Sequence, residues 1–108
     1  SLYLDERDRL VESLDGKRAM ILKNHGLMTV GNTVAAAFQR LYRLERACQV
    51  QIDAGAAGTL NVISDNVAAK SGADTNAFAE SEDGFGYGEL EYTALLRKMD
   101  RLDASYAA

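Results

Sequence analysis

The side chains that could do chemistry in this sequence are few and lie far apart. The single histidine, His25, stands between Asn24 and Gly26, and the single cysteine, Cys48, lies in a long segment with helical spacing. A catalytic zinc usually takes three ligands from His, Cys, Asp or Glu, and no spacing ties Cys48 to His25. From the residues alone, we therefore interpret His25 as a core histidine whose ring N–H bonds a backbone carbonyl, rather than as a metal ligand. Cys48 is interpreted as core rather than nucleophile.

Two other stretches have side chains or backbone groups that suit anions. The glycine cluster Gly84–Gly88 superficially resembles a phosphate-binding loop, but acidic residues surround it and no strand precedes it, so a flexible turn is favoured. Arginines recur every three residues at Arg40, Arg43 and Arg46. An anionic ligand is one interpretation of this spacing, and a solvated face or a subunit contact is the favoured one. The acids within residues 5–8 fit a helix start rather than an acid/base pair.

Apolar spacing predicts the elements that position His25. The runs Ala19–Leu22 and Leu27–Val30 predict two short strands, and the first is continuous enough to be covered on both faces. A short amphipathic helix is expected over Asp5–Leu14, because its apolar residues have helical spacing and Gly16 follows as a stop. The histidine would then lie in the connection between the two strands.

The rest of the chain is predicted to be helical at both ends of a looser middle. Thr33 is a good N-cap for a long helix that ends near Gly55 and Gly58. The segment at about 55–88 is rich in glycine and polar residues, so we expect a short helix over 64–70 and an exposed loop over 72–88. Residues 89–102 predict an amphipathic helix whose apolar stripe docks on this chain's core or on a neighbouring subunit.

Composition excludes some classes of protein. The 108 residues are 47% hydrophobic and 26% charged with a net charge of −4, which is typical of one globular domain or part of one. Basic and acidic residues alternate, so no nucleic-acid partner is expected. No apolar run approaches the roughly 18 to 20 residues that cross a bilayer, and the first residues lack the order of a signal peptide. We therefore expect no membrane partner and a soluble, cytoplasmic protein.

Residues 19–49 resemble the second half of the class II aldolase/adducin family. The likeness rests on Asn24-His25-Gly26 between two strands, the Gly31-x-Thr33 turn, and the helix that contains Leu-Glu-Arg-Ala-Cys-Gln. Residues 91–106 also resemble the C-terminus of that family. The resemblance implies that residues 1–108 are the C-terminal part of a class II aldolase/adducin-like domain. The expected fold class is α/β, a partial three-layer α/β/α fold with a β-hairpin around His25, a long helix and a C-terminal helix.

In enzymes of this family, a divalent metal is held by a His-x-His pair and by the histidine of the His-Gly motif, which here is His25. The metal is usually zinc, with manganese or cobalt as alternatives. It acts on a phosphorylated sugar or similar hydroxy-carbonyl compound as a Lewis acid that stabilises an enediolate. This sequence has no His-x-His and no identifiable catalytic carboxylate. The resemblance thus implies that the remaining metal ligands come from outside this chain.

The resemblance leaves two classes of function open. One is the C-terminal part of a metal-dependent lyase, and the other is a non-catalytic scaffold or interaction domain like the adducin head. In both, the family implies a homo-oligomer, which is a tetramer in many members.

Overall fold

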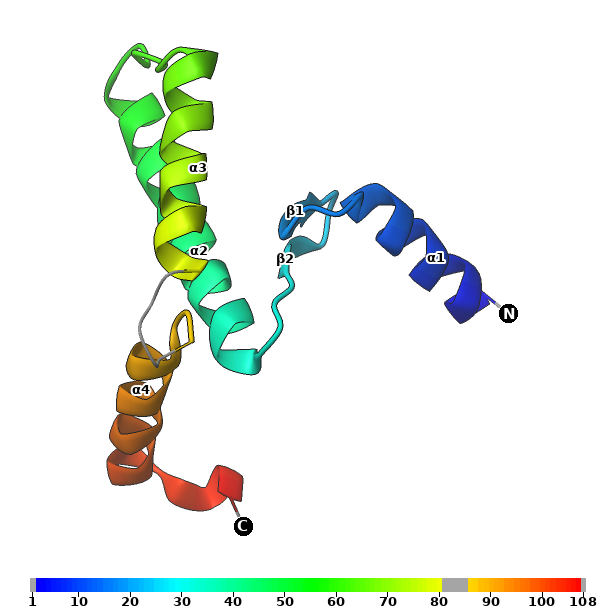
Figure 1. Cartoon of the computed structure of the whole chain (residues 1–108), viewed down its shortest axis with the longest axis vertical. Helices are drawn as coiled ribbons and strands as arrows, with labels where there is room; N and C mark the ends of the chain where they lie inside the picture. Colours follow the sequence, from blue (N-terminus) through cyan, green and yellow to red (C-terminus); the bar gives the residue numbers. More distant parts are fainter. Residues whose placement is uncertain (1, 81–85, 108) are drawn as a thin grey trace.

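The computed structural model describes residues 2–80 and 86–107, which form an extended α/β arrangement rather than a single compact layer stack (Figure 1). Its elements in chain order are α1 (Leu2–Leu14), β1 (Ala19–Leu22), β2 (Gly26–Thr29), α2 (Val34–Ala57), α3 (Asp65–Glu80), α4 (Glu89–Leu102) and a 3-10 helix, η1 (Ala104–Ala107). Helix α1 projects from the hairpin away from α2, and α4 extends from the N-terminal end of α2 in the direction opposite to α3 (Figure 1). The expected α/β character is confirmed.

The two strands form one antiparallel hairpin. Ala19 pairs with Thr29 and Leu22 with Gly26, so the predicted first strand is confirmed, and the second begins and ends one residue earlier than predicted. The expectation that the first strand is covered on both faces is wrong, since Ile21 is 68% exposed. Within the described residues the sheet has two strands, and α2 packs against β2, so one face of the hairpin has no covering layer.

Helix α2 is attached to the hairpin through small and hydroxyl side chains. Thr33 caps the helix as predicted, because its Oγ1 accepts a 3.0 Å hydrogen bond from the backbone N–H of Ala36. The Thr29 hydroxyl donates a 2.7 Å hydrogen bond to the carbonyl of Ala37. Ala35 and Ala36 are buried, and their small side chains allow close packing at this junction. The long helix then runs to Ala57, in agreement with the end predicted near Gly55 and Gly58.

Helix α4 docks on the first turns of α2. Gly88 precedes α4 with a φ of 79°, and a Cβ atom at this position would lie 2.7 Å from the carbonyl oxygen of Ala35. The residue must therefore be glycine, both for its backbone conformation and for the space. The rings of Phe38 and Tyr92 meet at a centroid distance of 5.7 Å and an angle of 57°, a tilted aromatic pair. The predicted apolar stripe of the last helix thus docks on α2 only at its start, at Tyr92, whereas Met99 and Leu102 further along α4 are exposed.

The middle of the chain differs most from prediction. The prediction of a short helix over 64–70 and a loop from residue 72 is wrong, since α3 continues to Glu80. A glycine inside a helix costs only about 1 kcal/mol, and the alanines on both sides of Gly72 favour helix strongly enough to offset it. Ser64 caps this helix with a 3.3 Å hydrogen bond from Val67 N–H to its Oγ. Residues 81–85 of the expected loop lie outside the described residues.

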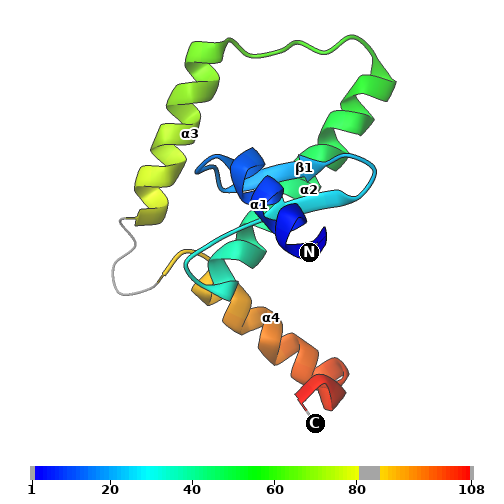
Figure 2. The ribbon, with the colours of Figure 1, turned by 90° about the vertical axis from the view of Figure 1, so that its right-hand side faces the viewer.

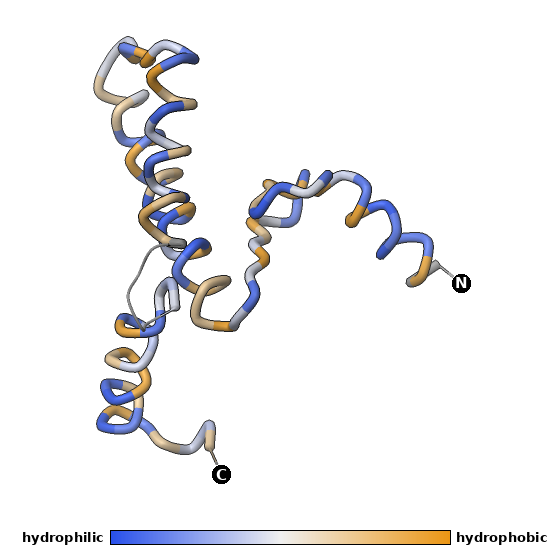
Figure 3. The backbone as a smooth tube through the Cα atoms, in the orientation of Figure 1, coloured by the Kyte–Doolittle hydropathy of each residue, from blue (hydrophilic) through white to orange (hydrophobic). Residues whose placement is uncertain are grey.

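The chain buries little apolar surface. Its accessible area is 8982 Å², whereas a compact monomer of this mass exposes about 5,900 Å². Its radius of gyration is 17.0 Å, against about 13 Å for a compact domain of this length. Figure 2 shows α3 standing apart from the C-terminal half of α2, and Figure 3 shows hydrophobic residues spread along every helix rather than gathered in one interior. Among the described residues, no helix has the length and apolar character needed to span a membrane.

Candidate functional site

His25 lies at the tip of the hairpin, in the connection between β1 and β2. Its backbone N–H donates a 3.2 Å hydrogen bond to the carbonyl of Leu22, which closes a tight turn. The residue is exposed, so the interpretation of His25 as a core histidine is wrong. The strands are too short and too thinly covered to enclose the turn, and the ring is therefore accessible.

The residues on both sides of His25 determine the path of the backbone. Asn24 has a φ of 57°, in the left-handed region that asparagine adopts more readily than most other residues. Gly26 has a φ of 153°, which side-chain-bearing residues rarely adopt. Together, these two conformations reverse the chain over three residues and bring Leu22 opposite Gly26. The Asn-His-Gly sequence is thus what presents the imidazole at the tip.

The described residues do not form a complete metal site. In the parts of the chain that the structure describes, there is no group of three or more His, Cys, Asp or Glu side chains that could hold a metal ion. Cys48 is half-buried on α2, where it lines a shallow cavity with Ala47, Gln51 and Ile52. This single imidazole fits one ligand position of a zinc-type site, and the other positions need donors from outside the described residues.

An apolar cavity of about 460 Å³ lies beside the turn. Gly26 and Leu27 form one wall, and Phe38, Leu41 and Tyr42 of α2 form another. Sequence reasoning placed this part of α2 in an apolar stripe but did not connect it to His25. The signal was the spacing of Phe38, Leu41 and Tyr42, which puts all three on one face of the helix. Apolar surface is therefore available next to the imidazole.

The glycine cluster is a helix-capping turn in its described part. The Glu89 carboxylate accepts a 3.1 Å hydrogen bond from Gly86 N–H, and Glu89 N–H donates to the carbonyl of Gly86. The backbone donor that could meet a phosphate at Gly86 is thus occupied by a carboxylate of the chain itself. Gly84 and Phe85 lie outside the described residues.

The three periodic arginines of α2 have different surroundings. Arg43 is exposed, and Arg46 donates a 2.7 Å hydrogen bond to the side chain of Gln49, as a solvated face predicts. Arg40 does not fit that interpretation, because it is half-buried and its Nη1 donates a 2.7 Å hydrogen bond to the carbonyl of Val30. The Arg40 guanidinium carbon also lies 5.4 Å from the centroid of the Tyr87 ring.

These observations define a class of α/β protein that presents one histidine at a hairpin turn, with a long helix packed behind the hairpin. Residues 3–52 match the family model described as Class II Aldolase and Adducin N-terminal domain. The chain belongs to the class II aldolase/adducin family. The resemblance inferred from the Asn-His-Gly segment is confirmed.

Similar curated proteins come from several kinds of organism. The chain is 36% identical over 108 residues to a Caulobacter vibrioides protein named an aldolase class 2 protein, a match that covers 99% of this chain and 40% of that protein. It is 43% identical over 71 residues to the decarboxylase NovR of Streptomyces niveus, covering 66% of this chain and 26% of that protein. It is also 32% identical over 93 residues to beta-adducin of Rattus norvegicus, a match that covers 79% of this chain and 13% of that protein.

The chain spans about two-fifths of the length of the Caulobacter relative and less of the other two. No solved structure matches it.

Proposed function

We propose that the protein to which this chain belongs is a divalent-metal-dependent lyase of the class II aldolase type, and that His25 is one of its metal ligands. The proposal is supported mainly by one observation, the exposed imidazole held at the tip of a turn by Asn24 and Gly26. A ligand needs a defined direction and an accessible nitrogen, and this turn provides both. The family assignment is consistent with it, since class II aldolases typically depend on a metal.

The proposed substrate is a phosphorylated sugar or a similar hydroxy-carbonyl compound. The proposed divalent cation is zinc, because imidazole is a preferred zinc ligand, and when bound it would supply a Lewis acid for the carbonyl oxygen. What this chain contributes is binding and orientation. The Thr29 hydrogen bond to Ala37 fixes β2, and with it the turn, to α2. The apolar cavity beside the turn offers Leu27 and Phe38 to the carbon skeleton of a ligand.

The decisive experiment is metal analysis of the intact protein. We expect about one zinc, manganese or cobalt ion per chain in the purified protein, and loss of that ion in His25→Ala. His25→Ala should leave the far-ultraviolet circular dichroism spectrum unchanged, because the ring is exposed. Lys23→Ala is the matched control, since it changes an exposed residue of the same turn and removes no metal-binding atom. An intact protein that binds no metal at saturating supply would contradict the proposal.

A second function, a non-catalytic scaffold or interaction domain, is favoured by the likeness to beta-adducin. In that case the apolar faces of the helices and hairpin serve protein contacts, and His25 has no metal to bind. The same metal analysis separates the two functions. A folded, intact protein without metal, whose assembly is unchanged by His25→Ala, supports the scaffold.

In either function we propose a homo-oligomer, as the family resemblance implies, and a cytoplasmic location. The large exposed apolar area supports association, since an isolated compact monomer would expose about a third less surface.

A further inference from the structure

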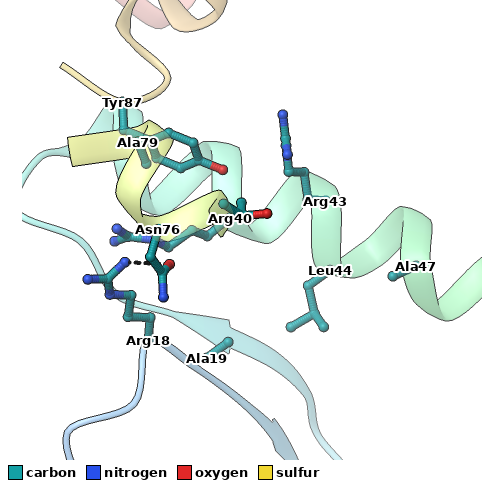
Figure 4. Close-up of a pocket in the computed structure, with 10 residues that line it drawn as sticks. Arg18, Ala19, Arg40, Arg43, Leu44, Ala47, Asn76, Ala79 and Tyr87 are labelled. Carbon is teal, nitrogen blue, oxygen red and sulfur yellow. Dashed lines mark hydrogen bonds between the residues drawn. The ribbon is translucent and has the colours of Figure 1, made fainter. Parts of the chain in front are cut away.

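A cavity of about 350 Å³ lies between the start of β1, the middle of α2 and the C-terminal half of α3. Three of its lining residues are arginines, namely Arg18, Arg40 and Arg43, and none of the described residues that line it is acidic. This concentration of positive charge stands out in a chain whose net charge is −4. It is also built from elements far apart in sequence, because Asn76 of α3 is hydrogen-bonded to Arg18, the residue before β1 (Figure 4).

Arg40 is the best-held of these side chains. Its Nη1 donates to the carbonyl of Val30 and its guanidinium lies over the ring of Tyr87, which restrains it on two sides. A Cβ atom on Gly31 would lie 3.0 Å from this Nη1 atom, so glycine at that position leaves space for the side chain. A guanidinium has five N–H donors, and the bond to Val30 uses one of them. Among the described residues, no carboxylate forms an ion pair with Arg40.

Arg18 presents a second guanidinium to the same space. Its Nη1 donates a 2.9 Å hydrogen bond to Oδ1 of Asn76, which ties the residue before β1 to α3. Figure 4 shows the Arg18 side chain meeting Asn76 and the Arg40 side chain extending along the same side of α2, whereas Arg43 points away from them. A second cavity of about 250 Å³ adjoins the first and shares Arg18, Arg40 and Tyr87 with it. The two guanidinium groups therefore stand where the two cavities meet.

We propose that this arginine cavity binds a small organic phosphate. Guanidinium groups match phosphate oxygens with paired, charge-assisted hydrogen bonds, and two of them in the lining of one cavity favour an anion there. The rest of the lining is largely apolar, with Ala19, Leu44, Ala47 and Ala79, and this suits the carbon part of such a ligand. A cavity of this volume is larger than inorganic phosphate alone requires.

The arginine cavity is separate from the histidine turn. Arg18 immediately precedes β1, and His25 follows the strand after Lys23 and Asn24, so six residues separate the two. At about 3.3 Å per residue, the four strand residues alone span roughly 13 Å. The proposal therefore does not depend on a metal at His25, and it extends the chain's ligand chemistry to a second place.

The test is a calorimetric or NMR titration of the full 108-residue chain with phenyl phosphate in low-salt buffer. We expect saturable binding that shifts the backbone amides around Arg40 and Asn76 and weakens as salt is added. Inorganic phosphate should bind more weakly, because it leaves the apolar lining uncovered. Benzoate tests the alternative anion. If benzoate binds as tightly as phenyl phosphate, the assignment to phosphate is overturned.

Four substitutions of arginine by glutamine test the residues. Arg40→Gln and Arg18→Gln should each weaken phenyl phosphate binding about tenfold, since each removes charge-assisted hydrogen bonds. Arg43→Gln should weaken it less, because its side chain points away. The matched control is Arg97→Gln on α4, which removes the same charge outside the cavity and should leave affinity unchanged. Equal losses in Arg97→Gln, or no binding by the unaltered chain, would overturn the proposal. If Arg40→Gln fails to fold, Arg18→Gln still tests the proposal, once circular dichroism has shown that this second variant is folded.

Discussion

The Thr29 hydroxyl and the Ala37 carbonyl oxygen are joined by a 2.7 Å hydrogen bond that links the strand following His25 to the first turns of α2. Thr29 is half-buried, so this polar contact is partly shielded from water. This bond attaches the hairpin that carries the candidate metal ligand His25 to the long helix α2. The stability and orientation of the hairpin therefore depend on it.

Thr29→Val should lower the free energy of unfolding by about 1 kcal/mol, because it keeps the shape of the side chain and removes the hydrogen bond. The measurement is urea unfolding of the 108-residue chain. Thr75→Val is the matched control, since the Thr75 hydroxyl also bonds a helix carbonyl, that of Ser71, but within its own exposed helix. An equal loss in both variants would contradict a special role for Thr29.

Gly88→Ala should displace α4 from α2. The new Cβ would lie 2.7 Å from the carbonyl oxygen of Ala35, and the φ of 79° disfavours alanine in its own right. We expect a loss of about 1–3 kcal/mol in stability, together with loss of the nuclear Overhauser contacts between the rings of Phe38 and Tyr92. Retention of those contacts would show that α4 docks without this close approach.

Gly72→Ala should have the opposite effect on stability. Gly72 lies inside α3, and no atom stands within 4 Å of the Cβ that alanine would add. Alanine should therefore stabilise α3 by up to about 1 kcal/mol through helix propensity. The gain appears as a higher helical signal in circular dichroism. A decrease would mean that residue 72 is not within a helix in solution. The loop predicted over 72–88 from the sequence would then be correct at this position.

The end of α4 should respond to acid through Asp103. A hydrogen bond from the backbone N–H of Ser105 holds the pKa of the Asp103 carboxyl below its usual value of 3.8. A lowered pKa means that the folded state favours the charged form, so this contribution is present at neutral pH. It is lost as the pH falls through the folded-state pKa. The NMR shift of the Ser105 amide should titrate with a midpoint below 3.8 and should not titrate in Asp103→Asn.

How far the sequence predicts this structure depends on whether the determining interactions are local. The cap at Thr33, the strand at Ala19–Leu22 and the turn at Asn24 each depend on a few neighbouring residues, and all three follow from the sequence. The length of α3 does not follow from the sequence, because Gly72 indicates a helix end, whereas the helix propensity of the surrounding alanines outweighs it.

The candidate site shows the same division. His25 could be selected as the residue of interest, but its exposure depends on which layers cover the hairpin, and one strand's apolar run cannot specify its neighbours. Arg40 could be selected with Arg43 and Arg46, but its half-buried setting could not be predicted, because its partners Val30 and Tyr87 lie 10 and 47 positions away in the chain. Helical periodicity describes the face on which a residue lies and carries no information about what packs there.

Self-association is the expected consequence of the exposed apolar surface. The chain exposes about 3,000 Å² more than a compact monomer of its mass, which exceeds the roughly 1,600 Å² buried in a standard interface. We expect sedimentation velocity at micromolar concentration to show dimers or larger assemblies. A monodisperse monomer with the hydrodynamic size of a compact 11.7 kDa protein would contradict this expectation.

The direction of the His25 side chain should depend on the backbone conformation of Asn24. Asn24→Gly keeps the left-handed conformation accessible, whereas Asn24→Val opposes a φ of 57° by about 1–2 kcal/mol. The reporter is hydrogen exchange of the His25 amide, whose N–H bonds the carbonyl of Leu22 at 3.2 Å. Exchange should be roughly tenfold faster in Asn24→Val, since 1.4 kcal/mol corresponds to a factor of ten, and near that of the unaltered chain in Asn24→Gly. Equal exchange in all three chains would mean that the turn does not rely on Asn24. In the intact protein, the same two variants should be compared for metal affinity. Both retain His25, so a difference between them reports the direction of the imidazole rather than its presence. Only Asn24→Val should bind the metal ion more weakly.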